Sequence, residues 1–219
     1  MSSSVLAIDL SSPRGCITAR RDGNTVYQAV FQSERSHNAS LFHPLAEALD
    51  ALGRTETGLV VTGTGPGSYT GVRISIATAQ GVALSCGWQV IGLPSICTGA
   101  VPSYHVLGDA RRGMFYHATV HGGRLIQPPI LLTRSEAEAA LQSVRSEPWL
   151  SFDPKPPLPG LVLATPDATA LAALAERLDQ DELTRLEKAA LEPFYLQEAF
   201  ITTARKAGKR VPEPLGSVA

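Results

Sequence analysis

The chain has 219 residues, of which 44% are hydrophobic and 18% charged, enough for one large domain or two small lobes with their own cores. A formal net charge of -1 argues against a dedicated nucleic-acid or membrane-surface binder. No apolar stretch is long enough to span a bilayer, and the N-terminal sequence lacks a basic signal-peptide segment. We therefore expect a cytoplasmic protein with no membrane contact.

The three cysteines form neither a CxxC motif nor a disulfide framework. Cys16, Cys86 and Cys97 each stand among apolar neighbours. We therefore predict three buried thiols in a reducing compartment.

The first strand is predicted over residues 5–10, a continuous apolar run that brings Asp9 to the edge of a sheet. Two further strands, over 16–20 and 25–31, flank a hairpin turn at Asp22-Gly23-Asn24. Leucines at helical spacing then predict a helix over 39–52, with Pro44 either at its first position or at a kink inside it.

A glycine-rich loop follows a short predicted strand over residues 58–62. Its glycines, at 63, 65, 67 and 71, lead into a helix over about 70–86 that is apolar on nearly every side and ends at Gly87. Such a helix needs cover all round, so one side should lie on a sheet and the other on a second helix or another chain. The loop lacks a Gly-Lys-Ser/Thr ending and the GxGxxG spacing. We favour a tight, closely packed strand-to-helix turn over a nucleotide loop.

The second half repeats the layout of the first. A strand over 106–109 ends in Asp109, and Gly123 follows Asp109 at the distance that separates Gly23 from Asp9. Later elements are strands over 114–120 and 125–132, a helix over 135–144, an irregular proline-rich connection over 146–160, a strand over 161–164, a helix over 167–178, an ordered segment over 193–196, and a mobile basic tail from about 205.

This order predicts a duplicated α/β fold of the actin-like (ribonuclease H-like) type, with a mixed sheet flanked by helices in each of two lobes. We place the N-terminal lobe at residues 1–104 and a smaller C-terminal lobe at 105–219.

The first strand's loop is a candidate nucleotide or anion site. Asp9, Ser11 and Ser12 stand where actin-like ATPases and sugar kinases carry a phosphate loop, although Asp9 could instead cap its own turn. In the second lobe, the bulky side chains of Arg111 and Arg112 suit an anion but not close backbone approach to a phosphate. Phosphoryl transfer is therefore disfavoured. The candidate loop residues are Asp9, Ser11, Ser12, Gly65, Gly67, Ser68, Asp109 and Arg111.

The histidines predict no metal site. His117 and His121 fall on a predicted strand, where residues four apart lie about 13 Å from each other and cannot share one ion.

Five segments together resemble the TsaB (YeaZ) family: VLAIDLSS at 5–12, GPGSYTGVRISIATAQGVAL at 65–84, IGLPS at 91–95, DARRG at 109–113 and PFYL at 193–196. The glycine-rich signature is the most specific of these. The resemblance covers most of residues 1–125 and the short C-terminal patch.

The resemblance implies an actin-like scaffold rather than an enzyme. TsaB proteins are the non-catalytic partner of TsaD in forming threonylcarbamoyladenosine at position 37 of tRNAs that read ANN codons, and the ATPase TsaE completes the assembly. It implies that tRNA is reached only through the complex, that this chain requires no cofactor, and that ATP or ADP could sit at the partner interface. At the positions of the metal-binding histidines of TsaD this chain has Ser95 and Gly99, which implies no metal.

By the same resemblance, the two helices over 39–52 and 70–86 bind TsaD, and serve self-association when TsaD is absent. The interface residues expected on them are Leu41, Leu45, Leu49, Arg73, Ile76, Ala79, Gln80 and Ala83. Two alternatives remain open: an actin-like ATP-dependent phosphotransferase using Asp9, and, with less support, a glycoprotease-type metallopeptidase.

Overall fold

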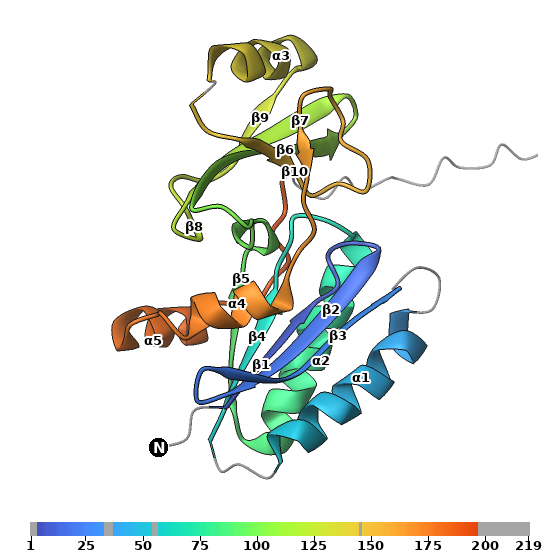
Figure 1. The fold of residues 1–219 in the computed structure, drawn as a ribbon, viewed down its shortest axis with the longest axis vertical. Helices are drawn as coiled ribbons and strands as arrows, with labels where there is room; N and C mark the ends of the chain where they lie inside the picture. The colour runs from blue at the N-terminus through green and yellow to red at the C-terminus, as the bar shows by residue number, and fades with distance from the viewer. Residues whose placement is uncertain (1–3, 33–36, 54–56, 145, 197–219) are drawn as a thin grey trace, which may run out of the picture.

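The computed structural model describes residues 4–32, 37–53, 57–144 and 146–196, which form two lobes, each built on one sheet (Figure 1). The first sheet has the order β3-β2-β1-β4-β5, and the second has the order β11-β10-β6-β7-β8, with β9 also paired to β7. The predicted α/β architecture of two mixed sheets flanked by helices is confirmed.

The first sheet places β1 at its centre, and every residue of β1 is buried. β2 pairs with β1 and β3 with β2 in antiparallel fashion, whereas β4 pairs with β1 and β5 with β4 in parallel fashion. The bounds are β1 (Ser4–Asp9), β2 (Arg14–Arg21), β3 (Asn24–Gln32), β4 (Leu59–Gly63) and β5 (Gln89–Leu93).

One face of this sheet is covered by α1 (His37–Leu52) and α2 (Tyr69–Cys86). The hydroxyl of Ser68 caps α2 by accepting a hydrogen bond from the Gly71 N–H, and Gly87 ends the helix in the left-handed conformation with φ 69°. Pro44 lies inside α1, which settles the alternative left open by the sequence.

The opposite face is covered by α4 (Ala168–Ala175), and α5 (Gln180–Lys188) follows it along the edge strand β5 (Figure 1). Leu171 and Ala172 of α4 pack into one core with Val5 and Ala7 of β1. Both helices fall within the range 105–219 that the sequence assigned to the second lobe, yet they lie on the first. Helix α5 was not predicted, because it has few apolar residues and none of its residues is buried.

The second lobe consists of one sheet with α3 packed on β7 and β9. The helix predicted over 135–144 is present, and a capping box of Thr133 and Glu136 starts it at Arg134. The bounds are β6 (Ser103–Arg111), β7 (Met114–His121), β8 (Arg124–Leu125), β9 (Ile130–Leu132), α3 (Arg134–Ser143), β10 (Trp149–Ser151) and β11 (Val162–Leu163), and a single 3-10 turn (Ser95–Cys97) precedes the lobe.

The prediction of an irregular connection over 146–160 is wrong at β10. This strand pairs in parallel with β6, and the Pro148 carbonyl accepts a hydrogen bond from the His105 N–H at 3.0 Å. The prolines at 154, 156, 157 and 159 come after the strand, so they do not interrupt its ladder.

Two of the three thiols are buried as predicted, those of Cys16 and Cys97. The prediction is wrong for Cys86, which is exposed because it is the last residue of α2, beyond the part that packs on the sheet. Within the described ranges, no helix is long and apolar enough to cross a membrane. The basic tail from about 205 lies outside the described residues.

Candidate functional site

The carboxyl group of Asp9 is sealed inside the first lobe. The side chain is 1% exposed, and its Oδ1 accepts a hydrogen bond from the Ser11 N–H at 2.7 Å, the turn-capping role that the sequence left open. A Cβ at Gly63 would overlap Oδ2, so the glycine backbone passes directly over the carboxyl group. Burial raises the pKa of Asp9 above its usual range, which favours the neutral form.

The glycine-rich loop packs onto the turn after β1. Gly67 and Gly71 lie so close to the carbonyl oxygens of Ser11 and Leu10 that a Cβ at either position would clash with backbone. The Ser68 N–H also donates to the Ser11 carbonyl at 2.7 Å. These contacts support the interpretation of the loop as a closely packed turn, because the backbone that could face a phosphate faces the chain itself.

The far side of the loop is held by Ser95, which stands at the position of one of the metal-binding histidines of TsaD. The Gly65 N–H donates to the Ser95 hydroxyl at 3.0 Å, and the Ser95 N–H donates to the Gly65 carbonyl at 2.8 Å. Ser95 therefore positions the loop. Among the residues that the structure describes, no three His, Cys, Asp or Glu side chains gather as metal ligands would.

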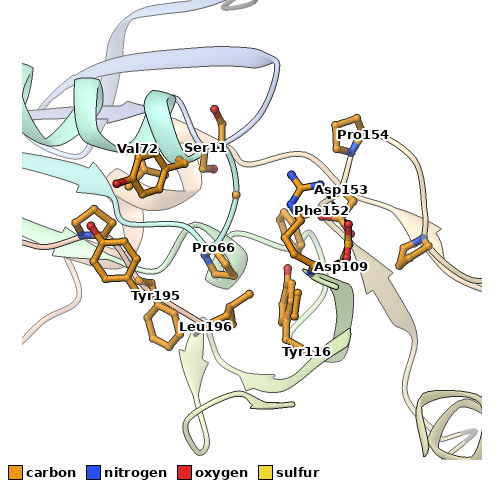
Figure 2. A pocket seen from close by; sticks show the side chains of 18 of the residues that line it. Ser11, Pro66, Val72, Asp109, Tyr116, Phe152, Asp153, Pro154, Tyr195 and Leu196 are labelled. Carbon is orange, nitrogen blue, oxygen red and sulfur yellow. Dashed lines mark hydrogen bonds and ion pairs between the residues drawn. The ribbon is translucent and has the colours of Figure 1, made fainter. Parts of the chain in front are cut away.

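A cleft of about 1000 Å³ opens between the two lobes (Figure 2). Of the candidate nucleotide or anion residues, Ser11, Gly67, Ser68, Asp109 and Arg111 line it, whereas Asp9, Ser12 and Gly65 do not. The Ser12 hydroxyl instead donates to the Arg14 carbonyl at 2.8 Å within its own turn.

The turn between β6 and β7 carries the basic side chains of the second-lobe wall. Arg111, Arg112 and Gly113 have φ of 71°, 55° and 76°, all in the left-handed region. Asp109 holds this turn, since its Oδ1 accepts from the Arg111 N–H at 2.7 Å while its own N–H donates to Asp153 Oδ2 at 2.7 Å. The Arg111 side chain stays 86% exposed.

The pKa of Asp153 is raised, and burial of the carboxyl group is the largest cause. This carboxyl group therefore contributes less negative charge to the cleft than an exposed aspartate would.

Most of the expected interface residues on α1 and α2 are not at the surface. Five apolar ones pack in the core that the two helices form with the first sheet: Leu41, Leu45, Leu49, Ala79 and Ala83. Ile76 is also buried. Of these only Leu49 is partly exposed. Arg73 and Gln80 are exposed, as an interface would require.

A different set of side chains points outward from the same helices. We call this the outer helical face, and it consists of Phe42, Ala46, Ala77, Gly81 and Leu84, all exposed. Phe42 is 59% and Leu84 87% exposed, while a Cβ at Gly81 would meet no atom within 4 Å. The spacing 77, 81, 84 marks this stripe in the sequence, but the apolar composition of the whole helix hid which stripe faces the sheet.

The predicted ordered segment at 193–196 fastens the chain's C-terminal part to the first lobe. The Phe194 N–H donates to the Thr64 carbonyl at 2.7 Å. The Arg73 guanidinium stacks on the Tyr69 ring at 3.9 Å and donates to the Tyr195 hydroxyl at 2.8 Å. Tyr69 and Tyr195 therefore stand together at the edge of the cleft.

A cluster of two histidines and a tryptophan in the second lobe was not predicted from the sequence. His105 Nδ1 lies 3.1 Å from His117 Nε2, and both rings pack against Trp149. Burial and the nearby His105 lower the pKa of His117 to about 4. The register of β6 against β7 was the signal that could have brought the two histidines together. His121, by contrast, is exposed, and its Nδ1 forms a hydrogen bond with the Ser103 hydroxyl.

Comparison with known proteins gives matches of three kinds. The family model described as TsaD, tRNA N6-adenosine threonylcarbamoyltransferase, matches residues 31–128. The tRNA threonylcarbamoyladenosine biosynthesis protein TsaB of Escherichia coli (strain K12) is 32% identical over 124 residues, covering 52% of this chain and 53% of the relative. TsaB of Bacillus subtilis (strain 168) is 30% identical over 121 residues, covering 51% and 52%. The chain thus spans about half the length of these curated relatives.

The fold extends further than the sequence match. YeaZ from Pseudomonas aeruginosa superposes with a TM-score of 0.65 at 22% identity, over 89% of this chain and 100% of that structure. The chain is therefore similar to TsaB proteins over about half of its length, and it shares the YeaZ fold over most of it.

Proposed function

We propose that this chain is a non-catalytic subunit that activates a TsaD-type enzyme in forming threonylcarbamoyladenosine at position 37 of tRNAs reading ANN codons. The observation that carries the proposal is the outer helical face, where Phe42 is exposed on α1, and Leu84 is exposed on α2 together with the small residues Ala77 and Gly81. Small residues let two helices approach to the 8–10 Å of ordinary helix packing, and the flanking large side chains then fill the contact.

The family match suggests what covers this face. The TsaD model matches residues 31–128, a range that includes both α1 and α2. A TsaD-type partner therefore carries a related helix pair. Two related surfaces can pack about a pseudo-two-fold axis, in the way that identical surfaces form an isologous dimer. The same face would serve self-association when the partner is absent.

The buried Asp9 supports the non-catalytic part of the proposal. Its carboxyl group does not line the cleft, its pKa is raised, and the glycine backbone covers its free oxygen. A phosphotransferase would need this carboxylate ionised and open to a metal–water shell. These contacts disfavour the phosphotransferase alternative. In the proposed assembly, a TsaE-type ATPase joins the pair, and any ATP or ADP sits at the partner interface.

Reconstitution tests the proposal. The isolated chain should make no modified adenosine in tRNA, whereas adding it to the TsaD-type subunit, the TsaE-type ATPase and the threonylcarbamoyl donor should stimulate synthesis. The matched control is a Leu84→Glu chain with unchanged thermal stability. Equal synthesis with and without the wild-type chain would contradict the activating role.

A further inference from the structure

The interlobe cleft is unusually rich in aromatic side chains. Six of the chain's thirteen Phe, Tyr and Trp residues line it: Tyr69, Phe115, Tyr116, Phe152, Phe194 and Tyr195. Phe115, Tyr116 and Phe152 are buried, whereas Tyr69 is 59% and Tyr195 48% exposed. The two exposed rings lie 6.4 Å apart at the mouth of the cleft with their planes at 47°, so each could stack a separate planar group; the Arg73 guanidinium already lies over one face of Tyr69.

The facing wall carries positive charge. Arg111, Arg112 and Lys155 line the cleft from the second lobe, and the lining carboxyl groups are those of Asp109 and Asp153. Figure 2 shows Tyr195 on one side of the cleft and Asp109 and Asp153 on the other. The contact between Arg111 Nη1 and Asp109 Oδ2, at 3.3 Å, is exposed, and exposed pairs of this kind are weak. The Arg111 guanidinium can therefore release Asp109 and bind an incoming anion in its place.

Both carboxyl groups of the lining are already used within the protein. Asp109 accepts from the Arg111 N–H, and Asp153 accepts from the Asp109 N–H. In the first lobe, the carboxyl group of Asp9 is sealed beneath the glycine-rich loop. The groups presented to a ligand are therefore mainly aromatic rings and cations, beside the 43% exposed carboxylate of Asp109.

We propose that the cleft binds an unpaired stretch of RNA, with bases stacked on Tyr69 and Tyr195 and phosphates held by Arg111, Arg112 and Lys155. Aromatic rings beside a basic groove are the combination by which proteins bind single-stranded nucleic acid. The cleft volume of about 1000 Å³ lies at the upper end of the range of ligand pockets. This inference extends the proposed role in tRNA modification, but it does not involve the outer helical face.

Fluorescence anisotropy with a labelled eight-nucleotide oligoadenylate and the full chain tests this assignment. Replacing two cations, in the Arg111→Ala/Lys155→Ala variant, should weaken binding roughly tenfold and reduce the slope of log K against log salt by about 1.4. Tyr195→Ala should weaken binding without changing that slope, because stacking releases no counterion. The matched control is Arg134→Ala, which removes an exposed arginine paired to Glu138 on α3, and it should bind as the wild type does.

Two outcomes would overturn the proposal. Equal binding by the wild type and the Arg111→Ala/Lys155→Ala variant would place the RNA elsewhere, for instance on the basic tail, which all variants share. Displacement of the oligonucleotide by AMP or MgATP at matched nucleotide concentration would assign the cleft to a free nucleotide. Retained binding of the TsaD-type partner by the same variants, measured by pull-down, separates failure here from failure of the proposed function.

Discussion

The Ser68 N–H donates a 2.7 Å hydrogen bond to the carbonyl oxygen of Ser11, which joins the glycine-rich loop to the turn after β1. The contact is possible because Gly67 and Gly71 leave no side chain between the two segments. The loop that looks like a phosphate cradle in the sequence is therefore a joint between the central strand and helix α2.

Gly71→Ala tests this joint. The new Cβ would clash with the Leu10 carbonyl oxygen, so we expect a loss of about 3 kcal/mol or more in the free energy of unfolding. Gly81→Ala is the matched control in the same helix. Its Cβ meets nothing within 4 Å, so it should stabilise the protein by about 0.5–1 kcal/mol. Urea unfolding measures both, and equal effects of the two substitutions would contradict the close packing.

The two stripes of α2 should respond differently to charge. Ile76→Glu places a carboxylate at a buried position of α2, 6% exposed, and should cost several kcal/mol of stability. Leu84→Glu changes a side chain that is 87% exposed and should shift stability by less than about 0.5 kcal/mol. Thermal unfolding followed by circular dichroism distinguishes them. A folded Ile76→Glu protein with wild-type stability would show that the buried stripe is wrongly assigned.

Asp9→Asn should not harm the protein at neutral pH. The amide oxygen can still accept from the Ser11 N–H, and the cost of burying a charge disappears. Because the pKa of Asp9 is raised in the folded state, its stabilising contribution is lost as pH rises above the unfolded value of 3.8. The free energy of unfolding of the variant, measured relative to wild type, should therefore increase as pH rises from 4 to 7.

The same variant separates two functions. A subunit that binds no metal through Asp9 should still stimulate adenosine modification after Asp9→Asn. Loss of stimulation by a stably folded variant would revive a catalytic role for this carboxylate.

His117 predicts a pH dependence of the opposite sign. Its pKa is lowered from 6.5 to about 4, so the unfolded chain binds a proton more readily than the folded one. The stability contributed by neutral His117 is complete above pH 6.5 and is lost as pH falls from 6.5 toward 4. Each pKa unit is worth about 1.4 kcal/mol, reduced here by the partial exposure of the ring. The expected loss is therefore a few kcal/mol at most.

A His117→Gln variant checks this dependence. Its unfolding free energy between pH 4 and 6.5 should vary less than that of the wild type. Parallel pH profiles of the two proteins would show that His117 does not contribute to the pH dependence in this window.

The sequence predicted β1 to β4 and the helices α1 and α2 of the first lobe because their signals are local. The buried run of β1, the hairpin at Gly23 and the left-handed cap at Gly87 are each set by neighbouring residues. Strand β10 was hidden among prolines, since its pairing with β6 and β11, which are distant in sequence, makes it a strand. Helix α5 has only two apolar residues, Leu183 and Leu186, which are half-buried against the core of the first lobe, and two are too few to mark a helix in the sequence.

The site was harder to predict because it depends on contacts distant in sequence. Ser11 and Ser68 meet across the fold, and so do Asp109 and Asp153 in the second lobe. For α2, composition predicted a helix needing cover on two sides, and Arg73 and Gln80, which were named as interface residues, are exposed. The sequence did not show which apolar residues of α2 point outward, because Ile76 and Leu84 look alike until the fold buries the first and exposes the second.

The affinity of a TsaD-type partner for the Leu84→Glu chain tests the proposed docking most directly, with Ile126→Glu, an exposed apolar position of the second lobe, as the matched control. Isothermal titration calorimetry should give wild-type affinity for Ile126→Glu. For Leu84→Glu we expect a loss of roughly a hundredfold or more, because the interface would bury an unpaired carboxylate. Wild-type affinity for a folded Leu84→Glu chain would show that the partner does not dock on the outer helical face.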